Sequence, residues 1–359
     1  MLGHFGLCNT GADCMPDMAR VMVAGIGGAS LGTEILKCLR DAGRYRVFGC
    51  DISALAYGHY ERGLAETFVI SRKRYVESVL ELCVANRVRA LIPGGEEPLV
   101  LLGPAAEDFL KAGVRLAANS AEVIATCSNK RRFFERMQVL GLPIPWTVAI
   151  QDREDLASLK DIPCPCVIKP CTGTGGSRFV FMAMNRSETE LYVEHLLHNG
   201  HTALVQEYIG LDEGEFTVGT LFLPEGRLVG SVAMQRLFNT KLSVLVSTQA
   251  GLISSGYSQG LIDEFAEVRA QAEKIAKALG SVGPMNIQGR LRKGILIPFE
   301  VNPRFSASTY LRAMAGFNEV DMYLQNVLYG IDPVVAPIRP GYYLRNFSEL
   351  YLPQEAIKR

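Results

Sequence analysis

The chain has 359 residues, which is enough for two or three units with their own hydrophobic cores. Its 37 lysine and arginine residues balance 37 aspartate and glutamate residues, so no net charge favours binding to nucleic acid or to an anionic membrane. Any affinity for phosphate groups would therefore have to arise from a local cluster of residues. The sequence also lacks a run of about 18 apolar residues, which predicts that no helix crosses a membrane.

The cysteines favour a reducing compartment. There are 9 of them and no CxxC pair, and the spacing of Cys164 and Cys166 suits neither a zinc knuckle nor a redox dithiol. Such an odd, unpatterned set is typical of reduced thiols, so we expect a cytoplasmic protein. Residues 1–19 lack the apolar stretch of a secretion signal and are predicted to form a loose extension before the fold.

Residues 20–120 alternate strand-like and helix-like segments. This alternation predicts a parallel sheet with helices on both faces. The first strand runs into a glycine turn and then into a helix with leucine and isoleucine on one face, which ends at Gly43. Strands are expected at 21–24, 45–51, 90–97 and 114–118, and further helices at 75–86 and 99–112.

The glycine turn leaves two interpretations open. Gly25, Gly27, Gly28 and Gly32 are followed by Asp51, as in a dinucleotide-binding unit that holds NAD. The spacing, however, is GxGGxxxG rather than GxGxxG. The alternative is a strand-to-helix turn that needs glycine only for close packing.

Residues 121–206 are predicted to form a second unit, rich in antiparallel strands. A linking helix starts near Asn129 and ends at Gly141, and two prolines stiffen the chain after it. A further helix at 187–200 begins with a serine, which is its predicted N-cap. Strands are expected at 147–150, 165–170 and 178–184.

Residues 207–330 continue with β-branched and alternating sequences, which are typical of strands. An amphipathic helix is expected at 263–280. The tail, 331–359, is too aromatic to be a disordered tag and is predicted to pack over either a substrate cleft or a dimer contact. Strands are expected at 203–210, 214–223, 227–237, 284–291 and 294–302.

A lysine and a glycine loop form the first candidate site. Lys169 closes an apolar strand, and three glycines lie within 173–177 soon after it. The backbone N–H groups of such a loop and a nearby ammonium group can together bind phosphate. A simple turn between two strands is the alternative.

The last two expected strands form a predicted hairpin. Residues 292–294 suit a three-residue turn with glycine at its left-handed position. That turn places Leu291 opposite Ile295 and, by the same register, Asn286 opposite Glu300.

Three polar side chains would then share one face of this hairpin, because residues two apart in a strand point to the same side. They are Gln288, Glu300 and Asn302, and Arg304 follows directly. Carboxylate and amide oxygens suit Mg²⁺, with phosphate completing its shell. The alternative is a polar, solvent-facing side of the hairpin.

Four segments in this order resemble the ATP-grasp superfamily: "SNKRRF", "VIKPCTGTGGSRFV", "VQEYIGLDEGEFTV" and "NIQG…FEVNPRFSAST". The chain is similar to one ATP-binding half of the carbamoyl phosphate synthetase large subunit. The resemblance implies α/β and α+β architecture. An N-terminal parallel α/β (pre-ATP-grasp) domain at 20–120, which in this family usually holds substrate, precedes a small lid subdomain at 121–206 and a large subdomain at 207–330.

The resemblance also implies ATP and Mg²⁺ (or Mn²⁺) between the two subdomains. The loop 172–177 would close over the phosphates as a lid, the backbone at 206–208 would meet adenine, and Glu215 or Glu213 would hold the ribose. Arg304 would steady the transferred phosphoryl group together with Lys169. The implied ATP contacts are Lys130, Lys169, Thr172, Gly173, Thr174, Gly175, Gly176, Ser177, Gln206, Glu207, Tyr208, Glu213 and Glu215, and the implied metal ligands are Gln288, Glu300 and Asn302.

The sequence departs from the family pattern at two places. Gly219 stands where an acidic residue often ends the strand, which weakens the ribose assignment. Ser306 and Ser308 replace an arginine-rich continuation, which puts bicarbonate in doubt as the substrate. Glu96 and Glu97 are candidates to bind the ammonium group of an amino-acid-like substrate; the alternative is acidic residues at a helix N-terminus.

The leading hypothesis is an ADP-forming ligase that activates a carboxylate as an acyl phosphate and joins it to an amine. Its partners would be small molecules rather than nucleic acid or membranes, and the family suggests a homodimer. The alternatives are a bicarbonate-activating subunit, a non-catalytic ATP-binding regulatory protein, and an NAD-dependent oxidoreductase.

Overall fold

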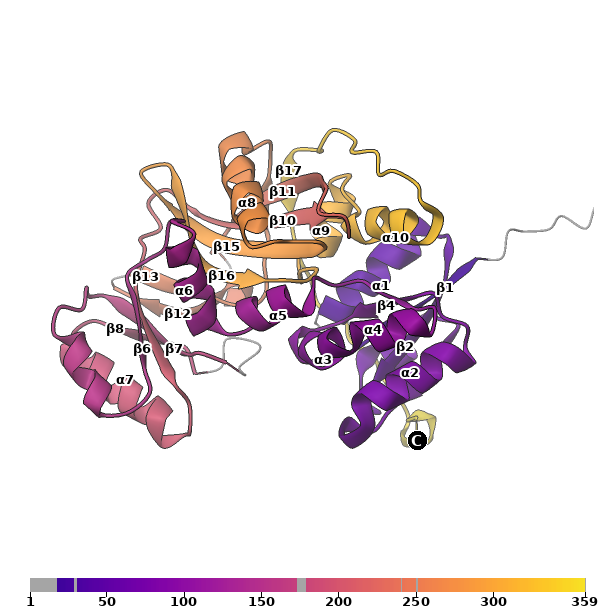
Figure 1. Cartoon of the computed structure of the whole chain (residues 1–359), viewed down its shortest axis with the longest axis horizontal. Helices are drawn as coiled ribbons and strands as arrows, with labels where there is room; N and C mark the ends of the chain where they lie inside the picture. The colour runs from indigo at the N-terminus through magenta and orange to yellow at the C-terminus, as the bar shows by residue number, and fades with distance from the viewer. Residues whose placement is uncertain (1–17, 29–30, 173–178, 240, 250, 359) are drawn as a thin grey trace, which may run out of the picture.

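The computed structural model describes residues 18–28, 31–172, 179–239, 241–249 and 251–358. The predicted extension, 1–19, lies outside these residues except for its last two. The described chain forms three lobes around a five-stranded parallel sheet, a four-stranded antiparallel sheet and a six-stranded antiparallel sheet (Figure 1). A smaller sheet contains two antiparallel strands, residues 244–248 and 251–254. This confirms the predicted mixture of a parallel α/β unit with antiparallel units.

The elements follow one another in the order expected for such a mixture. The strands are β1 (Ala19–Ala24), β2 (Tyr45–Asp51), β3 (Glu66–Val69), β4 (Ala90–Pro93), β5 (Arg115–Leu116), β6 (Thr147–Ile150), β7 (Cys166–Pro170), β8 (Phe181–Ala183), β9 (Ala203–Glu207), β10 (Glu215–Phe222), β11 (Leu228–Arg236), β12 (Val244–Thr248), β13 (Gly251–Ser254), β14 (Gly260–Ile262), β15 (Pro284–Arg292), β16 (Ile295–Asn302) and β17 (Gly341–Tyr343). The α-helices are α1 (Leu31–Ala42), α2 (Tyr75–Ala85), α3 (Glu96–Leu102), α4 (Ala106–Lys111), α5 (Ala121–Cys127), α6 (Lys130–Val139), α7 (Arg186–His198), α8 (Ala266–Ala278), α9 (Thr309–Met314) and α10 (Glu319–Tyr329).

The parallel sheet has the strand order β3-β2-β1-β4-β5. Its edge strand β3 was not expected from the sequence. The single helix predicted at 99–112 is wrong, because Pro104 interrupts it and leaves α3 and α4 as separate short helices. The strand predicted at 90–97 stops at Pro93, so Glu96 and Glu97 instead open α3.

The small sheet has the order β6-β9-β7-β8, and α7 packs on it around a separate apolar core. The predicted serine cap of α7 is wrong. Asn185 is the N-cap, and its side chain accepts a hydrogen bond from the backbone N–H of Glu188 at 2.9 Å. The Glu188 carboxylate reaches back to the Met184 N–H at 2.8 Å, which makes the pair a reciprocal cap.

The hairpin of β15 and β16 differs in register from the prediction. Its turn contains two residues, Lys293 and Gly294, both with positive φ (54° and 71°), so Arg292 lies opposite Ile295. A bulge shifts the pairing again at Phe299, which has no partner in the ladder between the pairs Gly289–Pro298 and Gln288–Glu300. The tighter turn and the bulge together explain why the predicted pairs Leu291–Ile295 and Asn286–Glu300 are wrong.

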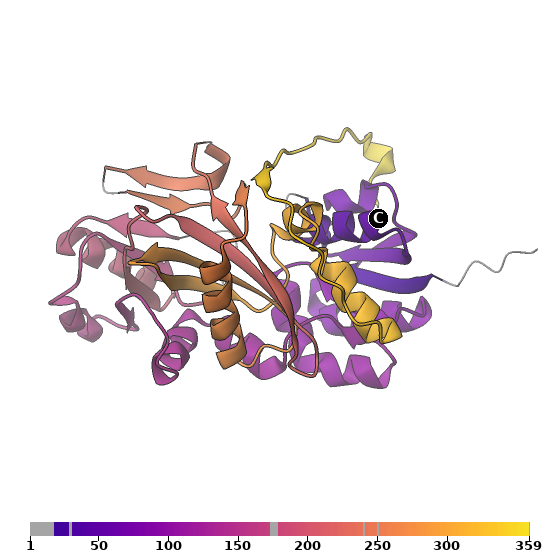
Figure 2. The same cartoon turned by 90° about the horizontal axis from the view of Figure 1, so that it is seen from above.

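The six-stranded sheet, ordered β16-β15-β10-β11-β14-β17, separates two cores. One face packs against α5, α6 and α8. The other face shares a continuous core with α9, α10, α1 and the parallel sheet, and Figure 2 shows α9 and α10 placed between the two sheets. The six-stranded sheet and the parallel domain, which both border the site described below, are therefore joined by one continuous apolar core. In the described part of the chain, no helix is long and apolar enough to span a membrane.

Candidate active site

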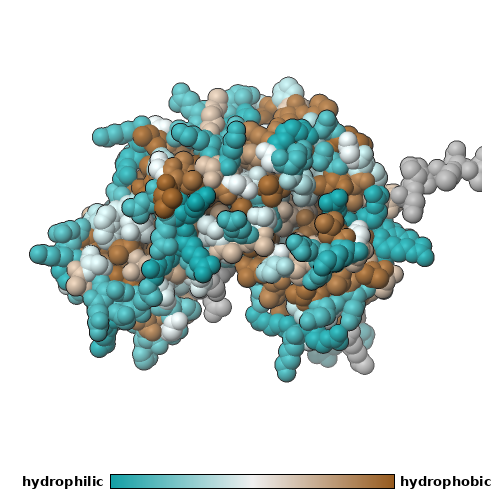
Figure 3. Space-filling model, in the orientation of Figure 1, coloured by the Kyte–Doolittle hydropathy of each residue, from teal (hydrophilic) through white to brown (hydrophobic). Residues whose placement is uncertain are grey.

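A cavity of about 480 Å³ lies where the three sheets meet. Its walls come from the carboxyl end of β4, from β7 and β9 of the small sheet, from β15 and β16, and from the chain between β13 and β14. On the outside of the molecule, the space-filling view has a deep notch between the lobe with α7 and the lobe with α2 to α4 (Figure 3).

Lys169 is buried in this cavity, with 7% of its surface exposed. Its Nζ donates hydrogen bonds of 2.9 Å to the side-chain oxygen of Gln206 and of 2.9 Å to the backbone carbonyl of Phe299. The second bond depends on the bulge, since Phe299 is the residue that the bulge leaves unpaired. Burial, and secondarily the charge of Lys130, lowers the pKa of Lys169 to about 7.

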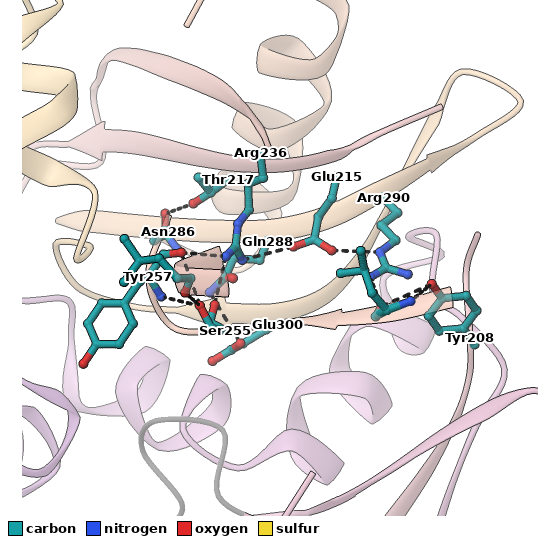
Figure 4. Close-up of polar contacts among 12 residues, drawn as sticks. Tyr208, Glu215, Thr217, Arg236, Ser255, Tyr257, Asn286, Gln288, Arg290 and Glu300 are labelled. Atoms are coloured by element: carbon teal, nitrogen blue, oxygen red, sulfur yellow. Dashed lines mark hydrogen bonds and ion pairs between the residues drawn. The ribbon is translucent and has the colours of Figure 1, made fainter. Parts of the chain in front are cut away.

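The three predicted metal ligands converge. Gln288 Nε2 donates to one Glu300 oxygen at 3.4 Å, and Asn302 Nδ2 donates to the other at 3.2 Å. Figure 4 shows Gln288 and Glu300 meeting at the hairpin. The described residues contain no group of three or more His, Cys, Asp or Glu side chains arranged for a metal. A cation here would therefore be held by one carboxylate and two amide oxygens, a donor set that fits Mg²⁺ when phosphate oxygens complete it.

Arg304 extends this cluster toward the part of the cavity that Ser306 and Ala307 line. Its Nη2 donates to Asn302 Oδ1 at 3.2 Å and its Nη1 to the Phe305 carbonyl at 2.8 Å. Its Nε is buried and has no hydrogen-bond partner among the described residues. Burial lowers the pKa of Arg304, partly offset by the charges of Glu96 and Glu300. A guanidinium that lines a cavity with its buried Nε unpaired suits an anionic ligand.

The two glutamates predicted to hold the ribose have other partners. Glu213 accepts hydrogen bonds from the backbone N–H groups of Lys293 (2.5 Å) and Gly294 (2.7 Å), which lower the pKa of its carboxyl. Glu215 is fully buried between Arg236 (3.1 Å) and Arg290 (2.8 Å). Neither side chain lines the cavity in this structure.

Arg236 and Arg290 hold one wall of the cavity, a role that the sequence did not indicate. Arg236 donates to the carbonyls of Ser255 (2.9 Å) and Tyr257 (3.1 Å), and Arg290 donates to that of Leu252 (2.8 Å). Figure 4 shows these contacts extending from the glutamate between them. The opposite charges on neighbouring strands are visible in the sequence, but they become a signal only once the sheet register is known.

Tyr208 completes this wall. Its hydroxyl accepts a hydrogen bond from the N–H of Leu252 at 2.9 Å and donates one to the carbonyl of the same residue at 3.2 Å. The guanidinium of Arg290 lies 4.7 Å from the centre of its ring.

The predicted hinge at 206–208 lines the cavity. Gln206 links Lys169 to the Thr147 hydroxyl, to which its Nε2 donates at 3.1 Å. The carboxylate of Glu207 forms an ion pair with Arg292 at 2.6 Å.

The remaining predicted phosphate contacts divide into three groups. Lys130 lines the main cavity. Thr172 lies in a separate groove beside Arg131 and Cys171. The predicted contacts Gly173, Thr174, Gly175, Gly176 and Ser177 lie outside the described residues.

The structure separates the four predicted substrate residues. Glu96 and Ser306 line the main cavity. Glu97 forms an ion pair with Arg72 and borders a smaller cavity of about 190 Å³. Ser308 is buried behind the main cavity, where its hydroxyl lies 2.9 Å from that of Ser306.

The glycine turn of the parallel domain packs closely against other parts of the protein and, at Gly25 and Gly27, borders the smaller cavity. The Asp51 carboxylate accepts hydrogen bonds from the N–H groups of Ile26 (2.9 Å) and Ser53 (3.0 Å). A Cβ atom on Gly28 would lie 2.8 Å from Cβ of Tyr57, and one on Gly32 would lie 1.9 Å from the Gly25 carbonyl oxygen. These contacts favour the close-packing interpretation of the turn over the NAD interpretation.

Comparisons with known proteins identify the family of the chain. Residues 127–308, just over half of the chain, match the family model described as "ATP-grasp domain". The carbamoyl phosphate synthase large chain of Neisseria meningitidis serogroup B is 28% identical over 236 residues, covering 64% of this chain and 21% of that protein. The same protein of Thermotoga neapolitana is 28% identical over 327 residues, covering 83% and 28%. The chain thus spans about a quarter of the length of these relatives.

Solved structures share the fold at low identity. The L-amino acid ligase from Bacillus licheniformis has a TM-score of 0.65 at 18% identity, covering 87% of this chain and 74% of that one. An ADP complex of N5-carboxyaminoimidazole ribonucleotide synthetase has 0.65 at 14%, covering 86% and 76%. The biotin carboxylase domain dimer of Hydrogenobacter thermophilus 2-oxoglutarate carboxylase, solved with MgADP, ADP and bicarbonate, has 0.65 at 18%, covering 90% and 73%. On the family match and this shared architecture, the chain belongs to the ATP-grasp family.

Proposed function

We propose that this protein is an ATP-dependent, ADP-forming ligase that activates a carboxylate and joins it to an amine. One observation supports this most: Lys169, the cluster of Gln288, Glu300 and Asn302, and Arg304 all line a single cavity. Together they provide cations for phosphate oxygens and oxygens for a divalent metal. Such a site neutralises the charge that moves during phosphoryl transfer.

In the proposed reaction, a substrate carboxylate oxygen attacks the γ-phosphorus of ATP, the bond to the β–γ bridging oxygen breaks, and ADP leaves. The neutral amine nitrogen then attacks the acyl carbon and loses a proton, and phosphate leaves. Lys169 and Arg304 would orient the phosphoryl oxygens, while Gln288, Glu300 and Asn302 would hold Mg²⁺, which supplies further charge neutralisation. The walls of the cavity would exclude water from the acyl phosphate.

The end of the cavity near Arg304 indicates the substrate class. Glu96 and Ser306 border it together with Arg304. An acidic group can bind an ammonium and a guanidinium can bind a carboxylate, so we propose an amino-acid-like substrate. The alternative is activation of bicarbonate, as the similarity to carbamoyl phosphate synthase large chains suggests.

The test is release of ADP and phosphate from MgATP in the presence of single amino acids, amino-acid pairs, common carboxylate metabolites or bicarbonate. Release that requires both a carboxylate and an amine would support the ligase and identify its substrates. Release with bicarbonate alone would favour the alternative. ATP binding without release under any condition would favour a regulatory protein.

A further inference from the structure

Residues 341–358, which we call the strap, join the six-stranded sheet to the parallel domain. At one end, β17 pairs with β14 at the edge of the large sheet. At the other end, Lys358 Nζ donates to the Thr67 carbonyl at 2.6 Å, and its N–H donates to the Tyr60 hydroxyl at 3.0 Å. Figure 2 shows the strap in yellow, arching from the large sheet to the parallel domain.

Arg345 is an enclosed charged side chain of the strap, with 6% of it exposed. Its Nη1 lies 3.1 Å from a carboxylate oxygen of Glu34 in α1. Its Nη2 donates to the carbonyl of Ala307, and its Nε approaches that of Ser258 at 3.4 Å. One guanidinium therefore connects the strap to the parallel domain and to two loops of the large lobe.

Both of these loops belong to the cavity wall. Ser258 and Ala307 line the cavity, and Ala307 lies in the same short loop as Arg304 and Ser306. A backbone carbonyl held by a buried guanidinium has little freedom to move. Arg345 thus fixes two loops that line the proposed substrate end of the cavity, although its own side chain does not line the cavity.

Neighbouring residues of the strap contact the same end. The ring of Phe347 packs edge-to-face on that of Tyr257, which lines the cavity, with centroids 5.1 Å apart. The Ser348 hydroxyl lies 3.2 Å from that of Tyr57, the residue that covers the glycine turn. None of these contacts involves Lys169 or the three proposed metal ligands.

We infer that Arg345 is a positioning residue for the organic substrate: by fixing the loop 304–308 it sets how that substrate binds, and it leaves unaffected the binding of MgADP, which lacks the transferred phosphoryl group. This inference rests on the proposed function for its kinetic consequence. Its structural consequence, a more mobile loop when the guanidinium is removed, does not depend on any substrate.

The test compares the full-length wild type with Arg345→Met, Arg345→Lys and the control Arg339→Met. Arg339 lies in the chain just before the strap with an exposed side chain. Arg345→Met is expected to fold, because Glu34 keeps its ion pair with Lys37 at 2.7 Å. Hydrogen–deuterium exchange in peptides covering 304–308 and 257–259 should speed up on the order of tenfold in Arg345→Met and stay unchanged in Arg339→Met.

The second measurement is steady-state kinetics with the substrates identified by ADP release. Arg345→Met should raise the KM of the carboxylate or amine substrate on the order of tenfold and leave the Kd of MgADP within about twofold. Arg345→Lys should restore part of the loss, since it keeps the charge beside Glu34 but cannot reach all three acceptors. A merely structural role would weaken nucleotide and substrate binding alike, without rescue.

Unchanged exchange at 304–308 in Arg345→Met would overturn the inference, whatever the enzyme's activity. Faster exchange together with an equal loss of MgADP affinity would also overturn it. If the wild type releases no ADP with any substrate, the proposed function fails, and the exchange experiment still decides whether the strap holds the loop.

Discussion

Lys169 is a buried amine whose charge depends on what occupies the cavity. Its pKa of about 7 means that much of it is neutral at pH 8 when no anion is bound. Because an unfolded lysine titrates near 10.5, the unfolded chain holds more protons between pH 7 and 10.5, so this group makes the unliganded fold more stable as pH rises through that window.

Nucleotide binding should therefore be coupled to the uptake of a proton by Lys169. Phosphate oxygens favour the charged ammonium, so MgADP binding at pH 8 should take up close to one proton, and binding at pH 6 should take up little. Titration calorimetry in buffers of different ionisation enthalpy measures this directly. Lys169→Met should abolish the uptake and weaken binding at least about tenfold, whereas Lys277→Met, an exposed change on α8, should do neither. Equal uptake in Lys169→Met would contradict the assignment.

Glu300 is the one carboxylate in the proposed metal cluster. Glu300→Ala should lower Mg²⁺-dependent ADP release at least about 100-fold, since the metal loses its only charged ligand from the protein. The free energy of unfolding should change by less than about 1 kcal/mol, because the side chain is only partly buried. Glu267→Ala in the first turn of α8 serves as the control. Turnover of Glu300→Ala at the wild-type rate would show that the metal is held elsewhere.

At the scale of single elements, β10 shows how one glycine allows a neighbouring arginine to be buried. A Cβ atom at Gly219 would lie 2.2 Å from Nη1 of Arg312. That guanidinium pairs with Glu319 at 3.1 Å and donates to Asn286 Oδ1 at 2.5 Å. The departure from the family pattern at this position therefore accompanies a buried charge network rather than a ribose contact.

Gly219→Ala should displace Arg312 and cost about 2–4 kcal/mol in the free energy of unfolding, because overpacking adds to the disruption of a buried ion pair. Gly256→Ala is the matched control, since a Cβ there meets no atom within 4 Å. Chemical denaturation of both variants gives the comparison. A Gly219→Ala protein as stable as the control would mean that the close approach is absent in solution.

At the scale of the whole molecule, the parallel sheet and the large antiparallel sheet share a core. Tyr45 of β2 donates a hydrogen bond to the Asp321 carboxylate in α10 at 2.7 Å, and Asn318 donates to the Cys38 carbonyl in α1 at 2.9 Å. Burial, together with this hydrogen bond and the nearby charge of Asp321, raises the pKa of Tyr45. The predicted unit 20–120 therefore buries its α1 face against residues far along the chain.

A fragment of residues 18–120 should consequently fail to fold by itself, because it lacks α9 and α10 and leaves the apolar face of α1 exposed. Its thermal melt, followed by circular dichroism, should lack a cooperative transition, in contrast to the full chain. A sharp transition in the fragment would show that this unit is independent of the helices that cover it.

Local sequence patterns were sufficient to predict most of the elements. The convergence of Gln288 with Glu300 and Asn302 survived a wrong register because the turn and the bulge each shift the pairing by one residue, and a total shift of two leaves all three side chains on the same face. The helix at 263–280 and the α/β alternation of 20–120 were likewise confirmed, because hydrophobic periodicity is a local property.

Contacts between distant segments were decided only by the tertiary structure. The bulge at Phe299 supplies a backbone carbonyl to Lys169. Glu215 is enclosed by Arg236 and Arg290 from the two neighbouring strands. Arg345 of the strap contacts both Glu34 in α1 and Ala307 in the loop after β16. Each of these depends on a sheet register or on the docking of segments up to 311 residues apart, as in the pair of Arg345 with Glu34. Such pairings follow from how whole elements bury their apolar faces together, and no stretch of sequence contains that information alone.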